Sequence, residues 1–346
     1  MKEKRKLTLK LTKKALLRLG LYTLCVLCCL GLLIAYHSVS RNLLSQQAAE
    51  RWRGDSETRY AQVSAFLPLT ETVSEGDIVS FRQKLEQKLT DASLEAPETG
   101  SLWTDAYTAA GEITLRVPDS SGSTSAHALG VGGDFFFFHP YQLRHGSYLT
   151  AYDVNDDRIV IDEELAWKLF GAVDVAGLTV YIGNEPYVIA GVISREEDRF
   201  STAAYGDTGA GAFLPYSAFY QLTEAEINTY ELVAADPISG FALNVLDSEF
   251  PLGSGETLEN SSRYGVERIA GLLADFGTRS MGRNGVAYPY WENAARMTED
   301  YLILFLLLAV LFALPPLILV LRIVIRRLCR LNAKLKQRVR EKREYV

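Results

Sequence analysis

Four oxygen-bearing side chains in the middle of the chain have the spacing of a calcium-binding loop. Asp153, Asn155, Asp157 and Glu164 occupy positions one, three, five and twelve of an EF-hand-like segment. Position six, where such a loop needs glycine for its sharp turn, is Arg158. No helical pattern precedes the segment. We therefore expect a solvated loop, and these four residues are kept as a weak calcium candidate.

The histidines offer a second possible set of ligands. They are His37, His127, His139 and His145, and two of them, His139 and His145, could join Asp134 around a metal ion. Their spacing is not that of a metal motif, and a zinc site usually needs a fourth protein ligand. We expect no metal site.

The patterns of nucleotide binding and of nucleophilic catalysis are missing. No G-x-x-x-x-G-K-[ST] loop occurs, and the glycine-bearing stretch 171–179 has no lysine to reach phosphates. No G-x-S-x-G motif and no Ser/His/Asp set is recognisable. We predict that the chain is not an enzyme and carries no cofactor.

The stretch that holds the calcium candidate has a regular pattern of its own. Arg158–Ile161 is a short β-branched run, and Asp162 is placed to cap a helix that ends at Gly171. Leu178–Ile182 and Tyr187–Ile193 follow as two strands around a Gly-Asn turn. This strand, helix and hairpin would hold Glu164 in the first turn of the helix.

The same stretch resembles the extracytoplasmic core domain of MacB-type ABC transporter permeases. In that family a strand leads into a "seelA..lFG" helix and then into "vGktv.i.g..y.ViGV". The matching residues are Ile161-Asp162-Glu163-Glu164-Leu165-Ala166, Leu169-Phe170-Gly171, Gly177-Leu178-Thr179-Val180 and Val188-Ile189-Ala190-Gly191-Val192, with Gly133-Asp134-Phe135-Phe136, Gly146-Ser147-Tyr148-Leu149 and Phe213-Leu214-Pro215-Tyr216 as weaker matches. The resemblance implies an α+β, two-lobed outer domain: a β-α-β porter-like lobe with a β-rich inserted lobe at about residues 126–234.

Two apolar runs are long enough to cross a bilayer, which takes about 20 residues. Leu19–Tyr36 has 18 residues without a charge, and Leu302–Leu321 has 20. Pro315 and Pro316 should kink the second run. The predicted organisation is a basic cytoplasmic segment (1–18), a transmembrane helix (19–36), an extracytoplasmic domain (37–300), a second transmembrane helix (301–325) and a basic cytoplasmic tail (326–346).

The net charge of −6 conceals a partition of charge along the chain. Residues 1–36 hold eight Lys/Arg and one Glu, and residues 322–346 hold ten Lys/Arg and two Glu. The segment between them holds 18 basic and 39 acidic residues, a net charge of −21. Basic flanks place both termini in the cytoplasm and the acidic domain outside the cell membrane. An acidic outer domain argues against nucleic acid as a partner.

The first span also raises the question of processing. Ser38-Val39-Ser40 has small residues suited to signal-peptide cleavage, but the apolar run exceeds the usual length of about 7–15 residues. We expect an uncleaved anchor. The four cysteines, Cys25, Cys28, Cys29 and Cys329, lie in or beside the spans. We expect them to be apolar filler, with no disulfide in the outer domain.

The first half of the outer domain contains local signals for individual elements. Arg59–Leu67 should be a strand, and Ser74 should open a capped helix. Trp103–Val117 is β-rich, with Gly111 as an expected turn or bulge, and Phe135–Phe138 should be buried.

The second half gives weaker signals. We predict a mobile loop at Ser194–Ala212, a strand at Phe241–Val245 and a closing strand at Gly285–Tyr288. A helix should present Val266, Ile269, Ala270, Leu273 and Phe276 on one face. The aromatic residues Tyr288, Tyr290, Trp291 and Tyr301 are expected at the membrane interface.

The tail should be a basic helix with one apolar face. Leu328, Leu331, Leu335 and Val339 are spaced three or four apart and are partner-docking candidates. The alternative is a positively charged anchor whose leucines rest on membrane lipid.

Two functions remain open from the sequence. The first is a non-catalytic, permease-like membrane subunit of a MacB-type ABC transport system. Permeases of that family carry two further spans after the second one. This hypothesis therefore implies a separate ABC ATPase, a second permease and a homo- or hetero-oligomer. The alternative is a stand-alone, membrane-anchored sensor or scaffold of the cell envelope.

Overall fold

The computed structural model describes residues 13–95, 100–118, 122–151, 155–206, 209, 211–275, 285–286 and 288–344, with the side chains of Ala15, Asp275 and residues 338–344 excepted. The chain divides into two compact units. One comprises Met1–Ser40 with Tyr301–Val346, and the other comprises Arg41–Asp300.

The described residues form both helices and strands. In chain order they are α1 (Lys13–Val39), η1 (Leu44–Gln46), α2 (Ala48–Arg53), β1 (Tyr60–Phe66), α3 (Glu75–Asp91), β2 (Trp103–Arg116), β3 (Ser123–Gly133), α4 (Phe135–Phe138), β4 (Gln142–Gly146), β5 (Arg158–Asp162), α5 (Glu163–Phe170), β6 (Thr179–Ile182), β7 (Glu185–Ser194), α6 (Arg199–Tyr205), β8 (Ala212–Pro215), α7 (Tyr216–Thr223), β9 (Thr229–Ala235), α8 (Phe241–Glu249), β10 (Glu256–Glu259), α9 (Val266–Asp275) and α10 (Tyr290–Glu344).

One mixed sheet forms the centre of the Arg41–Asp300 unit. Its strand order is β10-β1-β9-β2-β3-β8-β5-β7-β4, with β6 paired to β2 and β7. β3 pairs with β8 and β5 with β7 in parallel, and the other pairs are antiparallel. β2 connects the two ends of the sheet, because it pairs with β9 over Trp103–Thr108 and with β3 over Ala106–Arg116. The two-lobed division stays a prediction, since the strands of the expected insertion join the others in this sheet.

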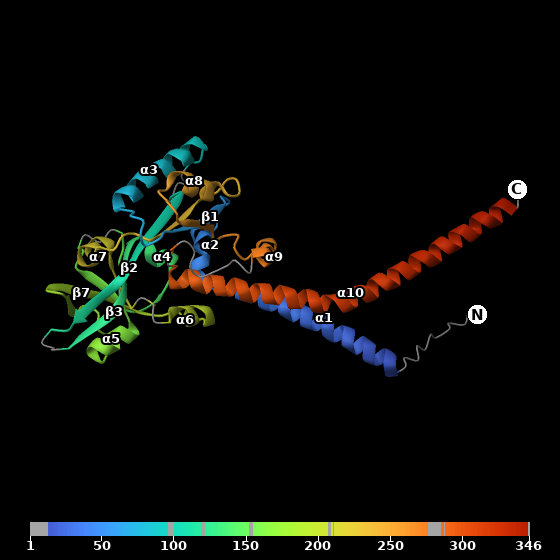
Figure 1. The fold of residues 1–346 in the computed structure, drawn as a ribbon, viewed down its shortest axis with the longest axis horizontal. Helices are drawn as coiled ribbons and strands as arrows, with labels where there is room; N and C mark the ends of the chain where they lie inside the picture. The colour runs from blue at the N-terminus through green and yellow to red at the C-terminus, as the bar shows by residue number, and fades with distance from the viewer. Residues whose placement is uncertain are drawn as a thin grey trace. The chain divides into compact units, whose positions relative to one another are not determined.

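The helices pack on the sheet in two groups (Figure 1). α3 and α8 contact each other, and α8 contacts β1 at one end of the strand order. α7 packs on β2 and β3, while α5 packs on β5 and β7. The main apolar core extends along the sheet and includes Phe81 and Ile193, and a smaller cluster is formed by Phe66, Val286 and Tyr288.

The strand, helix and hairpin predicted around Asp162 are confirmed. Asp162 accepts the backbone N–H of Leu165, and α5 ends at Gly171 in the left-handed conformation. β6 and β7 follow as the predicted hairpin, with Gly183 at φ 60° in the turn. The local signals were sufficient here because caps and turn residues act over a few residues.

The predicted capping box at Ser74 is also confirmed. The Ser74 hydroxyl accepts the N–H of Asp77, and the Asp77 carboxylate accepts the N–H of Ser74. The apolar positions spaced three and four apart on α3, Ile78, Phe81, Leu85 and Leu89, are all buried. Capping and amphipathic spacing therefore agree on the same helix.

The turn or bulge expected at Gly111 is wrong. β2 runs through this residue in unbroken register, with Gly111 opposite Ala128 on β3. A Cβ on Gly111 would lie 3.1 Å from Cζ of Phe219, so the glycine serves a close approach of α7 to the strand.

Two further strand predictions, both in the second half, are wrong. Phe241–Val245 begins helix α8, because Asp236 accepts the N–H of Ala242 at the helix start and Ala242, Val245 and Leu246 share a buried face. The strand that pairs with β1 at the edge of the sheet is β10, and among the described residues of Gly285–Tyr288, Val286 forms an isolated bridge with Pro68. A short strand on the sheet edge, with half-exposed residues, gives little apolar periodicity to detect.

The segment predicted as a mobile loop, Ser194–Ala212, contains helix α6. The Asp198 carboxylate accepts the N–H groups of Phe200 and Ser201, which caps the helix. Phe200 and Tyr205 are buried, so tertiary packing holds a segment that is polar and glycine-bearing in sequence.

The other compact unit contains the two predicted spans. α1 includes Leu16–Val39 and α10 includes Tyr290–Gln337, and both are long and apolar enough to cross a membrane. α10 continues through Pro315 and Pro316. All four cysteines are free.

Candidate functional site

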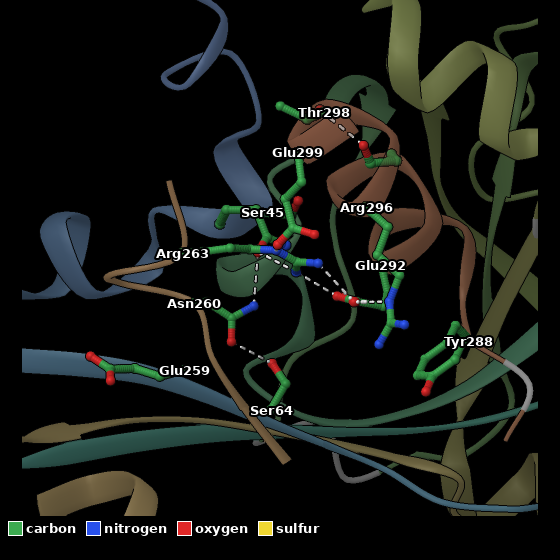
Figure 2. A network of polar contacts seen from close by, with 12 residues as sticks. Ser45, Ser64, Glu259, Asn260, Arg263, Tyr288, Glu292, Arg296, Thr298 and Glu299 are labelled. Atoms are coloured by element: carbon green, nitrogen blue, oxygen red, sulfur yellow. Dashed lines mark hydrogen bonds and ion pairs between the residues drawn. The ribbon is translucent and has the colours of Figure 1, made fainter. Parts of the chain in front are cut away.

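The candidate site is a buried network of charges at the start of α10. Its centre is Arg263, whose side chain is 1% exposed. Its Nη1 and Nη2 donate to the two carboxylate oxygens of Glu292 at 2.6 and 2.8 Å, and its Nε donates to Oε1 of Glu299 at 2.6 Å. Figure 2 shows the guanidinium between the loop after β10 and the first turns of α10. One arginine therefore joins two carboxylates of the same helix to the outer domain.

A second arginine extends the network along α10. Nε of Arg296 donates to Oε1 of Glu292 at 2.6 Å, and one of its Nη atoms lies 3.3 Å from Oε2 of Glu256 on β10. Its guanidinium also lies 3.9 Å from the centroid of the Tyr288 ring. The two arginines and the two buried glutamates, Glu292 and Glu299, balance in charge.

Uncharged side chains connect the network to the edge of the sheet. Gln46 on η1 accepts from Nη1 of Arg263 at 3.2 Å and from the amide of Asn260 at 2.8 Å. The Ser64 hydroxyl on β1 donates to Asn260 at 3.0 Å (Figure 2). The start of α10 is thus linked to β1, β10 and η1 by hydrogen bonds in a buried region.

The electrostatics of Arg263 follow from its surroundings. Burial alone would lower the pKa of its guanidinium, but Glu292 and Glu299 outweigh burial and hold that pKa above its usual value. A buried ion pair adds little net stability when complete, whereas loss of one partner is strongly destabilising. Separating the first turns of α10 from the loop after β10, the two parts that meet in this joint, would therefore cost free energy.

A second buried contact lies beside the first. Nε2 of His139 lies 2.6 Å from Oε2 of Glu231 on β9, and both side chains are almost fully buried. The His139 ring packs 4.3 Å from the Trp291 ring, and the hydroxyl groups of Tyr141 and Tyr290 are hydrogen-bonded. The first two residues of α10 are therefore held by α4, β9 and their connecting segments.

These contacts correct one prediction from the sequence. Tyr288, Tyr290 and Trp291 are buried in the outer domain and do not form an exposed aromatic belt. Their hydroxyl and ring contacts lie within the domain. The burial expected for Phe135–Phe138 is confirmed for Phe135 and Phe138, while the two rings between them are half-buried.

The histidine and aspartate candidates do not share a site. His139 pairs with Glu231, His145 lies 3.3 Å from Asp174, and Asp134 accepts the hydroxyl of Thr104 at 2.6 Å. Within the described ranges, no group of three or more His, Cys, Asp or Glu side chains is arranged to hold a metal ion.

The calcium candidates are only partly described. Asp153 lies outside the described residues, Asn155 and Asp157 are exposed, and Glu164 is in the first turn of α5. There Glu164 forms ion pairs with Lys168 at 2.7 Å and Arg195 at 2.8 Å. The absence of calcium binding stays a prediction, for which Glu164→Ala is the decisive variant if calorimetric titration gives saturable heat.

The docking candidates all belong to α10. Leu328, Leu331 and Leu335 have exposed fractions of 59%, 57% and 60%, and Val339 lies on the same helix beyond the described side chains. Their role as a docking face stays a prediction.

Sequence reasoning missed the ion-pair network. Glu292, Arg296 and Glu299 are spaced four and three apart just before an apolar run, which marks one charged helix face. No local pattern identifies Arg263, which lies 29 residues before Glu292 in the chain. Only the tertiary fold brings it to that face.

A search of family models finds the MacB-like periplasmic core domain over residues 23–244. A Chromobacterium violaceum protein named macrolide export ATP-binding/permease protein MacB is 26% identical over 120 residues, which is 34% of this chain and 18% of the relative. The protein of that name from Agrobacterium fabrum is 31% identical over 97 residues, 27% of this chain and 15% of the relative. The alignments thus span less than a fifth of these relatives' length.

Solved structures of other proteins also align with this chain. The periplasmic region of MacB from Actinobacillus actinomycetemcomitans aligns with a TM-score of 0.40 at 18% identity, covering 68% of this chain and 99% of that chain. The extracellular domain of the noncanonic ABC-type transporter YknZ aligns with a TM-score of 0.38 at 15% identity, covering 58% and 100%. Arg263, Glu292, Arg296 and Glu299 lie beyond the segment matched by the family model.

Proposed function

Because the chain belongs to the MacB-like periplasmic core domain family, we propose that it is a non-catalytic, permease-like membrane subunit of a MacB-type ABC transport system. In this proposal both termini are cytoplasmic and the acidic domain is outside, where it changes conformation or binds substrate or partners. A separate ABC ATPase supplies the energy. A second permease completes the membrane part of a homo- or hetero-oligomer.

The observation that carries the proposal is the ion-pair network of Arg263, Glu292, Arg296 and Glu299. Glu299 lies three residues before Leu302, where the apolar run of α10 begins. Two buried carboxylates of this helix are bound to an arginine of the outer domain. Separating buried ion pairs costs free energy. In this proposal a movement of the membrane-spanning part of α10 would therefore also move the outer domain, with the ion pairs kept intact.

The contacts of Tyr290 and Trp291 support the same role. Trp291 packs against Phe135 of α4 and against His139 just after it, and Tyr290 stacks on Tyr205 of α6. The start of α10 is therefore attached on one side to the β10–β1 edge and on the other to α4 and α6. A rotation or shift of α10 would act on both parts of the outer domain.

The test begins with the native complex. The full-length chain, tagged and expressed in its own host, is purified from membranes in mild detergent. The proposal expects an ABC ATPase and a second permease to co-purify. Recovery of the chain with neither would reject it in favour of the stand-alone sensor or scaffold.

A second measurement tests coupling within that complex. Amide hydrogen exchange of the outer domain is compared with and without ATP, for wild type and for Arg263→Met. We expect an ATP-dependent difference in the wild-type complex and its loss in the variant, with the ATPase still bound. The matched control is Lys168→Met, which also removes one cation from an ion pair but lies on the exposed surface of α5.

A further inference from the structure

A cavity of about 200 Å³ in the outer domain is lined mainly by residues of α3, β2, β3, α4 and α7. Its wall includes the aromatic rings of Tyr107, Phe136 and Tyr216, and the rings of Tyr107 and Tyr216 meet edge to face with their centroids 5.7 Å apart. One buried water needs about 10–15 Å³ of such space, so the cavity has room for a small organic molecule. The aromatic wall suits the apolar part of that molecule.

Arg82 brings a hydrogen-bond donor to the lining of this cavity. Its Nε and Nη2 donate to the two carboxylate oxygens of buried Asp105 at 2.7 Å each, which fixes the plane of the guanidinium. Among the described residues, Nη1 of Arg82 has no hydrogen-bond acceptor. The Arg82 side chain is 30% exposed. Since Arg263 holds two carboxylates at once, a guanidinium that already has one carboxylate partner can bind a second.

A carboxylate lies at the hydroxyl end of Tyr107. The Tyr107 hydroxyl donates to Oε1 of Glu75 at 2.7 Å, while the Tyr107 ring centroid is 5.9 Å from the guanidinium carbon of Arg82. Within the described part of the chain, Oε2 of Glu75 has no hydrogen-bond donor. Gly132 permits this arrangement, because a Cβ on it would collide with the Tyr107 ring. Asp156 adds a second carboxylate to the lining, so the cavity offers both signs of charge beside aromatic rings.

We propose that this cavity binds a small zwitterion, an α-amino acid with an aromatic side chain. Its carboxylate binds Nη1 of Arg82, its ammonium group binds Oε2 of Glu75, and its ring packs against Phe136 and Tyr216. A simple anion would be repelled by the carboxylates of the lining and a simple cation by the guanidinium, so a ligand with both charges is favoured. The site lies within the Arg41–Asp300 unit, and binding there does not rest on an ATPase or a second permease.

The test is isothermal titration of the full-length chain in detergent with three probes that share one ring. L-Phenylalanine carries both charges, phenethylamine lacks the carboxylate and 3-phenylpropionate lacks the ammonium group. The proposal expects L-phenylalanine to bind and each of the other two to bind about tenfold more weakly or worse, because each loses one charge-assisted hydrogen bond. Absence of saturable heat with L-phenylalanine, or equal affinity for the three probes, would overturn it.

A substitution then tests the role of Glu75. Glu75→Gln keeps an acceptor for the Tyr107 hydroxyl but removes the charge, so the affinity for L-phenylalanine should fall about tenfold or more. Glu86→Gln, a matched change at an exposed position of the same helix, should leave that affinity unchanged. Equal affinity in wild type and Glu75→Gln would overturn the proposal. The comparison of the three probes uses only the wild type, so it decides the question even if the variant fails to fold.

Discussion

Arg263 and Glu292 form a bidentate ion pair with distances of 2.6 and 2.8 Å, although 29 residues separate them and their side chains are 1% and 0% exposed. The pair joins the loop after β10 to the first turns of α10. Since Glu299 also binds Arg263, one cation neutralises part of the charge of two buried carboxylates. The stability of this joint should therefore depend strongly on that one guanidinium.

Arg263→Met should lower the free energy of unfolding by about 3–5 kcal/mol, because buried carboxylates lose their partner while an unbranched apolar stem is retained. Urea titration of the full-length protein in detergent, followed by tryptophan fluorescence, measures the change, and buried Trp291 is one of the four tryptophans that contribute to the signal. Lys168→Met should cost less than about 1 kcal/mol, since its ion pair with Glu164 is exposed. Similar losses in the two variants would contradict the importance given to the network.

Ser74→Ala should destabilise the protein by about 1 kcal/mol through loss of the capping box at the start of α3. The same denaturation experiment measures this loss. Glu86→Ala, a substitution of an exposed residue in the body of α3, is the control and should leave stability almost unchanged. A loss of equal size in the control would mean that the cap is not responsible.

The capping box also predicts an acid dependence. The hydrogen bond from the Ser74 hydroxyl, followed by that from its backbone N–H, lowers the pKa of Asp77 below its usual value. A lowered pKa in the folded state means that the stabilisation is present above the unfolded-state pKa and is lost as the pH falls through the folded-state pKa. Asp77→Asn should therefore flatten the fall in stability as the pH decreases below about 5. An unchanged slope would exclude this contribution.

Gly130→Ala should destabilise the protein by about 1–3 kcal/mol because of overpacking. A Cβ on this strand residue would lie 2.6 Å from Cδ1 of Phe219, whose side chain is fully buried and has no space to retreat into solvent. In combination with Phe219→Ala, the loss should be less than the sum of the two single losses. Gly76→Ala is the control, because its Cβ would meet only Ser74 Oγ at 3.5 Å and alanine suits a helix.

The double variant Leu331→Asp with Leu335→Asp tests the tail. If this face docks a cytoplasmic partner, recovery of co-purified ATPase or permease should fall sharply while membrane insertion is retained. Ala333→Asp with Gln337→Asp adds the same charge on the opposite face of α10 and should leave recovery unchanged. Unchanged recovery with the leucine variant would leave the tail as an anchor on lipid.

The sequence by itself determined the features that depend on neighbouring residues. The caps at Ser74 and Asp162, the turn at Gly183 and the two apolar runs were predictable because cap hydrogen bonds, positive φ and hydrophobic length are local properties. Resemblance to a family likewise follows from the order of such local segments.

Tertiary structure decided the features that depend on distant partners. From the sequence, Gly111 was expected to form a turn or bulge. In the structure it lies against the ring of Phe219, more than a hundred residues away in the chain, and its lack of a side chain makes room for that ring. Phe241–Val245 has β-compatible residues, but Asp236 and the surface of β1 make it a helix. Arg263 is an ordinary surface residue by composition, and it becomes the centre of the site only because folding removes it from water beside Glu292 and Glu299, where an unpaired charge would be costly.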